Sequence, residues 1–279
     1  MKGHMTQHAI TDDLDDRTLA GALATAAGDL LLDVRATSGL AGKELGNAGD
    51  RQSDDFILAE LARLRPDDNV LSEESADDKS RLGAARVWIV DPVDGTREYG
   101  AVDASGEGRR DWAVHVALWS SVGGGTLIAG AVALPALGVT YVDDETPIPP
   151  TDGLTDSPRG EKLRVVVSGS RPPAFSQAVA DAIGGEVVQM GSAGAKAMAV
   201  VRGEADAYVH AGGQYEWDSA APVAVAQAKG LWCSRIDGSP LVYNQDDTYL
   251  PDLVICRPEL RDAIIAVTSS EPTPTSESR

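Results

Sequence analysis

The sequence predicts a mixed α/β fold built as one large unit of two halves. The first half contains two helix-forming stretches followed by several β-forming runs, and the second half alternates strands with helices. The length of 279 residues allows one large core, and a hydrophobic content of 43% is typical of a globular protein. Residues 145–161 are rich in proline and glycine and predict a surface connection. We therefore expect a single unit over residues 12–268, with halves 12–145 and 162–268.

The first half begins with two predicted amphipathic helices. Apolar residues from Leu19 to Val34 recur at helical spacing after an acidic start, and Gly39 follows as a stop. A second helix is expected to begin at about Ser53, whose side chain can cap it, and to end before Pro66. Strands are expected next at residues 69–71, 86–91, 112–119, 127–134 and 139–142. The run 112–119 alternates in the period of a strand, with Trp112 and every second residue after it on one face.

The second half shows the period of an α/β unit. Strands are predicted at residues 163–168, 187–190 and 205–209, and helices near 173–183, 195–202 and 219–229. His115 within one strand and His210 at the end of another are expected to be structural residues. Residues 269–279 lack apolar side chains and predict a disordered tail.

Charge and composition exclude several classes of function. Lys and Arg number 24 against 43 Asp and Glu, and the formal net charge of −19 disfavours binding to nucleic acid or anionic membranes. The two cysteines, Cys233 and Cys256, are too few for a disulfide framework or a thiolate metal site. The acidic N-terminal segment does not resemble a targeting signal, and the longest weakly polar run, 127–139, is shorter than the ~20 residues of a membrane span. We expect a cytoplasmic protein.

Carboxylates follow predicted strands at two places and begin a predicted helix at a third. They occur in Asp-Pro-Val-Asp-Gly-Thr at residues 91–96, at Glu73 and Glu74, and at Asp218. Ligands of α/β folds bind at strand ends, and neighbouring carboxylates repel one another unless a cation such as Mg²⁺ lies between them. Each place also has an ordinary explanation: a surface turn for 91–96, a solvated Glu pair, and a favourable helix N-terminus for Asp218.

The three segments together resemble a known signature. With Asp50 and Trp-Asp-Ser-Ala-Ala at 217–221, they resemble the inositol monophosphatase superfamily of lithium-sensitive, Mg²⁺-dependent phosphatases, from the first helix to about Leu260. Residues 168–171 and 191–196 most resemble its CysQ-type members, which act on 3′-phosphoadenosine 5′-phosphate in sulfate assimilation. The resemblance implies an α-β-α-β-α sandwich of the inositol monophosphatase/fructose bisphosphatase type. It implies hydrolysis of that nucleotide to AMP by metal-activated water, with inositol 1-phosphate and fructose 1,6-bisphosphate as alternative substrates.

The resemblance also implies roles for individual residues. One Mg²⁺ would be held by Glu73, Asp91 and the carbonyl of Val93, and a second by Asp91, Asp94 and Asp218. Thr96, paired with Asp50 and assisted by Glu73, would orient and help to deprotonate the attacking water. The implied substrate contacts are Gly95, Thr96, Ser168, Arg171, Gly194, Lys196 and Asp218. Two or three Mg²⁺ per site are implied, with Mn²⁺ as a substitute and Li⁺ and Ca²⁺ as inhibitors.

Each of these roles has a plainer alternative. Thr96 can be a turn hydroxyl, Asp50 a residue near a helix start, and Lys196 and Arg171 solvated charges. Tyr215 and Trp217 can stack on adenine or belong to the core. The implied partner is a small phosphate ester, and a homodimer is compatible with the family.

The residues themselves argue against two rival functions. A haloacid-dehalogenase-type phosphatase forms an aspartyl-phosphate on an Asp-x-Asp motif, but here two residues, Pro92 and Val93, separate the aspartates. We therefore expect no covalent intermediate. A non-catalytic, acidic cation-binding protein is the rival of a different class. Its best candidate, a Ca²⁺ loop at residues 103–114, has Val114 where a Glu ligand is needed.

Overall fold

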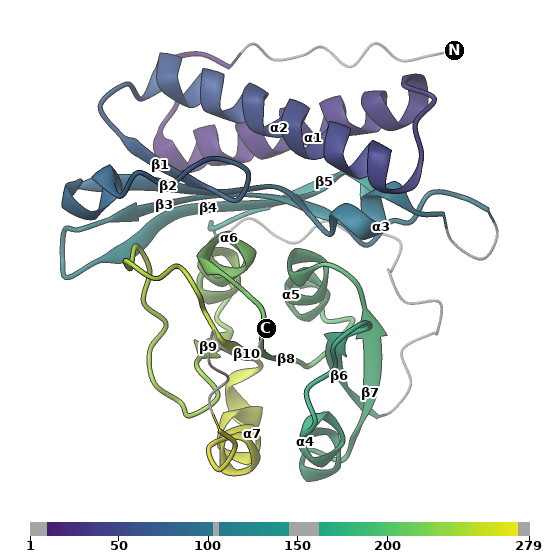
Figure 1. The fold of residues 1–279 in the computed structure, drawn as a ribbon. Coiled ribbons are helices and arrows are strands. Elements are labelled where there is room, and N and C mark those ends of the chain that lie inside the picture. Colours follow the sequence, from purple (N-terminus) through teal and green to yellow (C-terminus); the bar gives the residue numbers. More distant parts are fainter. Residues whose placement is uncertain (1–9, 103–105, 145–161, 273–279) are drawn as a thin grey trace.

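A computed structural model describes residues 10–102, 106–144 and 162–272 of the chain. In these residues the elements form five layers: two helices, a sheet, two helices, a second sheet, and two outer helices (Figure 1). The predicted α-β-α-β-α sandwich is thereby confirmed. The predicted connection 145–161 lies outside the described residues, as do residues 103–105 of the candidate Ca²⁺ loop and residues 273–279 of the predicted tail.

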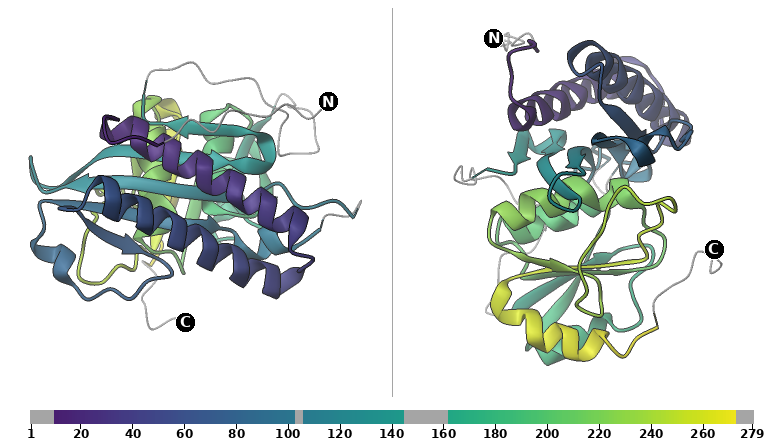
Figure 2. Two further views of the ribbon diagram at one scale, coloured as in Figure 1. Left: turned by 90° about the horizontal axis from the view of Figure 1, so that it is seen from above. Right: turned by 90° about the vertical axis from the view of Figure 1, so that its left-hand side faces the viewer.

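The first layer consists of helices α1 (Asp16–Thr37) and α2 (Gly42–Leu64), which lie side by side on the first sheet (Figure 2). The carboxylate of Asp15 caps α1 by accepting a hydrogen bond of 2.7 Å from the backbone N–H of Thr18. The predicted start of α2 at Ser53 is wrong, because Gly46 and Gly49 interrupt the apolar pattern of its first half. These glycines permit close packing: a Cβ at Gly46 would lie 2.7 Å from Thr96 Cγ2, and one at Gly49 would lie 2.5 Å from Tyr99 Cε1.

The first sheet has the strand order β1-β2-β3-β4-β5. β1 runs parallel to β2, and the remaining neighbours are antiparallel. One face packs on α1 and α2 through side chains that include Trp112 and Val114, and the other contributes Ala113 and Ala117 to the core around α5 and α6. The alternation predicted for 112–119 is therefore confirmed, with both faces buried. The strands are β1 (Asn69–Ser72), β2 (Arg86–Asp94), β3 (Ala113–Ser120), β4 (Thr126–Leu134) and β5 (Val139–Val142).

The second half contributes the other three layers. Helices α5 (Ala193–Val201) and α6 (Glu216–Ala228) separate the two sheets, and α4 (Ser176–Ala182) and α7 (Arg261–Thr268) cover the far face (Figure 1). The second sheet has the order β7-β6-β8-β10-β9. Its strands are β6 (Leu163–Ser168), β7 (Gly185–Met190), β8 (Ala207–Ala211), β9 (Trp232–Ser234) and β10 (Asp252–Cys256).

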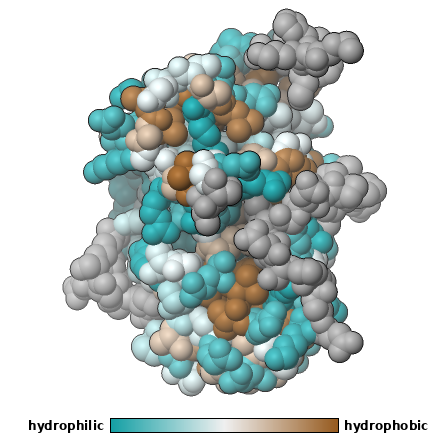
Figure 3. Space-filling model, turned by 90° about the vertical axis from the view of Figure 1, so that its right-hand side faces the viewer, coloured by the Kyte–Doolittle hydropathy of each residue, from teal (hydrophilic) through white to brown (hydrophobic). Residues whose placement is uncertain are grey.

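Short elements complete the described fold. The five-residue helix α3 (Thr96–Gly100) follows β2 directly, and 3-10 turns occur at η1 (Ser80–Gly83), η2 (Pro135–Leu137) and η3 (Pro258–Leu260). No helix within the described ranges combines the length and apolar character that a bilayer span requires. Hydrophilic residues predominate on the face shown in Figure 3, where apolar residues are exposed only in separate patches.

Candidate active site

Carboxylates from three segments converge at the C-terminal end of β2. Asp91 and Asp94 flank a register shift between β2 and β3, and Asp218 lies in the first turn of α6. One carboxylate oxygen from each of these three residues lies within 4.8 Å of the others. Glu73 follows β1, the parallel neighbour of β2, and its backbone N–H donates to Val90 O at 3.2 Å. The topology of the sheet thus brings together carboxylates that are up to 145 residues apart in the sequence (218 − 73).

Several carboxyl groups lie close together here, and their environment disfavours the ionised forms. Burial, together with the charges of Glu73 and Asp94, raises the pKa of Asp91 well above its usual range. Burial and the charge of Asp94 raise the pKa of Asp218 to about 7. Although Glu73 is an exposed residue, loss of hydration among its neighbours and the charge of Asp218 raise its pKa to about 8. A set of hard oxygen ligands that resists full ionisation fits a divalent cation such as Mg²⁺, which would remove the repulsion.

Asp94 differs from its neighbours because donors surround it. Its Oδ2 accepts hydrogen bonds from Ser192 Oγ and from Gly194 N at 2.6 Å, and its Oδ1 accepts from Ala193 N at 3.0 Å. Burial opposes ionisation, but the contact with His115 and the hydrogen bond from Ser192 hold the pKa of Asp94 well below its usual range. Asp94 therefore joins the end of β2 to the N-terminus of α5.

His115 links the same carboxylate to α6. Its Nε2 lies 3.2 Å from Asp94 Oδ2, and its Nδ1 lies 3.0 Å from the carbonyl oxygen of Trp217. The side chain is fully buried. The residue expected to be structural thus contacts one candidate ligand and the residue next to another, Asp218.

Thr96 and Asp50 face each other across the junction of α2 and α3. Thr96 Oγ1 lies 3.1 Å from Asp50 Oδ1 and 3.2 Å from Val93 O. Burial and the charge of Glu74 raise the pKa of Asp50 to about 7. Asp50 lies in the interior of α2, so its interpretation as a residue near a helix start is wrong. Gly95, with a φ of 88°, makes the left-handed turn that places Thr96 at the start of α3.

Two neighbouring residues of α2, Ser53 and Asp54, hold the two carboxylate-bearing segments in place, although their sequence did not suggest a role in the site. Ser53 does not cap a helix; its Oγ donates to Pro92 O at 2.9 Å, between Asp91 and Asp94. The neighbouring Asp54 accepts from the hydroxyls of Ser72 and Ser75, the latter at 2.9 Å, on either side of Glu73 and Glu74. The spacing of Ser53 and Asp54 from Asp50, three and four residues, places all three on one face of a helix, and this was the available signal.

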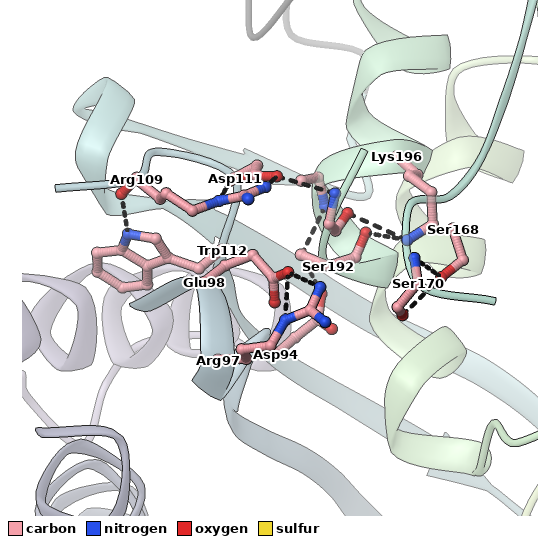
Figure 4. A network of polar contacts seen from close by, with 12 residues as sticks. Asp94, Arg97, Glu98, Arg109, Asp111, Trp112, Ser168, Ser170, Ser192 and Lys196 are labelled. Atoms are coloured by element: carbon pink, nitrogen blue, oxygen red, sulfur yellow. Dashed lines mark hydrogen bonds and ion pairs between the residues drawn. The ribbon is translucent and has the colours of Figure 1, made fainter. Parts of the chain in front are cut away.

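A pocket of about 350 Å³ opens beside these groups and is lined from both halves of the chain. The first half contributes Asp94, Gly95 and Thr96, and the second half contributes basic side chains and serine hydroxyls. Figure 4 shows Asp94 across from Ser168 and Ser170, with Ser192 and Lys196 between them. The lining residues from the second half are Ser168, Ser170, Arg171, Gly191, Ser192, Ala193, Lys196, His210, Gly213, Gln214 and Asp218.

Lys196 is the buried cation of this pocket. Its Nζ donates to the carbonyl oxygens of Gly191 at 3.1 Å and Ser192 at 2.5 Å. Burial lowers the pKa of Lys196 to about 8, although the charge of Asp94 opposes this shift. The alternative of a solvated lysine is therefore wrong. Gly194 N–H, expected to contact substrate, is bonded to Asp94.

Two further predicted contacts lie at the rim. Ser168 Oγ accepts from the backbone N–H of Arg171 at 3.2 Å, and Arg171 Nη2 lies 3.5 Å from Gly213 O. Tyr215 and Trp217 stack on each other, with ring centroids 4.8 Å apart and an interplanar angle of 6°. Trp217 also packs against the main core, as the alternative to adenine stacking predicted.

Comparisons with known proteins agree with this geometry. A model of the inositol monophosphatase family matches residues 15–272. A protein of Mycobacterium leprae named 3′-phosphoadenosine 5′-phosphate phosphatase is 48% identical over 262 residues, covering 91% of this chain and 94% of its own. A protein of the same name from Mycobacterium tuberculosis is 51% identical over 260 residues, covering 92% and 94%. The crystal structure of inositol monophosphatase-II from Staphylococcus aureus superposes with a TM-score of 0.71 at 19% identity, covering 91% of this chain and 92% of that one, which supports the fold alone.

Proposed function

Because the chain belongs to the inositol monophosphatase family, we propose that it is a phosphomonoesterase that hydrolyses 3′-phosphoadenosine 5′-phosphate to AMP and phosphate. The pocket carries this proposal, since it joins a carboxylate cluster to a cationic wall. A nucleotide with two phosphates needs one site for the phosphate that is hydrolysed and another for the phosphate that stays. We propose that residues 12–268 act as one catalytic unit, because neither half lines the pocket alone.

The carboxylate side of the pocket fits the phosphate that is hydrolysed. Glu73, Asp91, Asp94, Asp218 and the carbonyl of Val93 would hold the Mg²⁺ ions. When bound, Mg²⁺ supplies positive charge that lowers the pKa of water and stabilises the leaving oxygen. We propose two or three ions, replaceable by Mn²⁺, with Li⁺ and Ca²⁺ as inhibitors.

The protein's own groups position the nucleophile. The hydroxyl of Thr96, within hydrogen-bond distance of Asp50, orients the attacking water. A carboxylate with a pKa of about 7 can accept a proton at neutral pH, so Asp50 serves as the base, with Glu73 assisting. The backbone N–H groups of Gly95 and Thr96 face the phosphate oxygens at a tight turn. Water attacks phosphorus directly, and no carboxylate becomes phosphorylated.

The other side of the pocket fits the phosphate that remains. Lys196 supplies a buried positive charge, and Ser168 and Arg171 supply donors at the rim. In this proposal Gly194 acts on the substrate indirectly, because its N–H at the start of α5 is bonded to Asp94. Formation of a homodimer, a cytoplasmic location, and the lack of binding to nucleic acid or membranes remain predictions.

The proposal is tested by phosphate release in the presence of Mg²⁺, with and without Li⁺. The substrates are 3′-phosphoadenosine 5′-phosphate, fructose 1,6-bisphosphate and inositol 1-phosphate. We expect kcat/KM for the nucleotide to exceed the other two at least about tenfold, and Li⁺ to inhibit. Preference for a sugar or inositol phosphate would retain the phosphatase and refute the nucleotide assignment. Release from none of them would favour the cation-binding alternative.

A further inference from the structure

Two buried side chains of the pocket present polar atoms without partners. His210 at the end of β8 is 3% exposed, and Gln214 in the turn that follows is 4% exposed. Within the described ranges, neither ring nitrogen of His210 has a hydrogen-bond partner, and the Oε1 atom of Gln214 has none either. A buried polar group without a hydrogen-bond partner destabilises the protein, so such atoms in a pocket wall indicate contacts that a ligand completes.

Both side chains line the pocket that also contains Asp94, Asp218, Lys196 and Arg171. Gln214 Nε2 donates to the hydroxyl of Tyr208 at 2.8 Å. The charges of Asp94, Asp218 and Arg171 influence the pKa of that hydroxyl. His210 is within reach of Lys196 and Arg171. A group recognised here therefore connects the site of the hydrolysed phosphate with the site of the retained phosphate.

The chemistry of the pair selects a hydroxyl group. Burial and the positive charge of Lys196 lower the pKa of His210 to about 3, and the backbone of Gly212, which opposes this shift, is not placed for a hydrogen bond. The imidazole is therefore neutral at pH 7 and presents one donor and one acceptor. A hydroxyl offers the matching donor and acceptor, whereas the oxygens of a phosphate dianion only accept. In either orientation of its amide, Gln214 adds one further free polar group.

We propose that His210 and Gln214 form a subsite for the free 2′-hydroxyl of a 3′-phosphorylated ribonucleotide. The inference rests on the proposed function, in which the ribose lies between the two phosphate sites. It makes the pair a specificity determinant that separates ribonucleotides from deoxyribonucleotides. It also revises the expectation that His210 is only structural.

The test compares kcat/KM for 3′-phosphoadenosine 5′-phosphate and for 2′-deoxyadenosine 3′,5′-bisphosphate. For the unmodified protein we expect the deoxynucleotide value to be lower by about 10- to 100-fold, because it leaves the imidazole unpaired. In His210→Leu and in Gln214→Leu the ratio should fall to within about threefold, mainly through a lower value for the ribonucleotide. His210→Gln keeps a donor and an acceptor and should retain part of the discrimination. Gln227→Leu, on the exposed surface of α6, is the matched control.

The outcomes separate this inference from the proposed function. Equal kcat/KM for the two nucleotides in the unmodified protein refutes the subsite and leaves the nucleotidase intact. An unchanged ratio in both leucine variants also refutes it, and Gln214→Leu keeps the test available if His210→Leu does not fold. If neither nucleotide is hydrolysed, the proposed function fails and the subsite fails with it.

Discussion

Replacement of Asp50 by Asn should stabilise the metal-free protein at high pH while it removes activity. The carboxyl of Asp50 has an ordinary pKa of 3.8, which burial and the charge of Glu74 raise to about 7. Between these two values the folded state binds more protons than the unfolded state. The free energy of unfolding therefore falls as pH rises through this window.

The size of the effect follows from that shift. For a single group with a pKa of 3.8 unfolded and about 7 folded, the contribution is full below pH 3.8, still more than half present at pH 5, and almost lost at pH 8. The difference amounts to at most about 2–3 kcal/mol. Asn has nearly the same volume and does not titrate, and its Oδ1 still accepts the hydrogen bond from Thr96. Between pH 5 and pH 8 the unmodified protein should thus lose about 2–3 kcal/mol more stability than Asp50→Asn.

The assay is denaturant unfolding at pH 5, 6, 7 and 8 with a chelator present, together with kcat at saturating Mg²⁺. Asp55→Asn, which changes an exposed carboxylate of the same helix, is the control and should follow the unmodified protein. We expect kcat of Asp50→Asn to fall by about 10²–10⁴, the range for loss of a general base. Parallel pH profiles for Asp50→Asn and the unmodified protein would refute the raised pKa. Retention of kcat would refute the role as a base.

Three further substitutions test the other parts of the site. Asp94→Asn should lower kcat by at least about 10³ without changing the circular dichroism spectrum, and an active variant would refute its role as a ligand; exposed Asp262→Asn should remain active. Asp54→Asn leaves one of the two serine hydroxyls without its acceptor. It should raise the Mg²⁺ concentration for half-maximal activity by about tenfold at nearly unchanged kcat. An unchanged Mg²⁺ titration would contradict the supporting role of Asp54. Lys196→Met should raise KM for 3′-phosphoadenosine 5′-phosphate at least about tenfold and affect inositol 1-phosphate much less, and an equal effect on both would remove Lys196 from the second phosphate site.

Local patterns predicted most helices and strands of this fold and failed where packing overrides them, whereas the order of the layers came from the family resemblance. The strand periodicity of 112–119 and the α/β alternation after residue 162 depend on neighbours in the sequence, and both were found. The first half of α2 was missed because Gly46 and Gly49 have low helix propensity. They are present because Thr96 and Tyr99 pack against them, and no local pattern reveals such a contact. β9, β10 and α7 were not predicted either. β9 spans only 3 residues and pairs only with β10, and β10 in turn pairs with β8.

For the candidate site too, the sequence identified some residues, whereas other contacts depend on tertiary packing. The carboxylates of 91–96 and Asp218 were identified because the segments occur together in the order of a family signature, although each segment alone has an ordinary explanation. The signature could not show that Ser192 bonds Asp94 across 98 residues, or that His115 lies between Asp94 and the carbonyl of Trp217. These contacts arise only when α5 and α6 pack on the first sheet.

The supporting contacts explain why the carboxylate cluster must bind a cation or a proton rather than spread apart. Asp94 is fixed by α5 and His115, the 91–94 turn is held by Ser53, and the segment with Glu73 is held through Asp54. With each carboxylate-bearing segment anchored by separate hydrogen bonds, repulsion cannot be relieved by moving the backbone. It must appear instead as raised pKa values, as it does for Asp91 and Asp218. Loosening any one anchor should therefore lower the affinity for Mg²⁺ and reduce the pH dependence of metal-free stability together, because both effects come from the same enforced proximity.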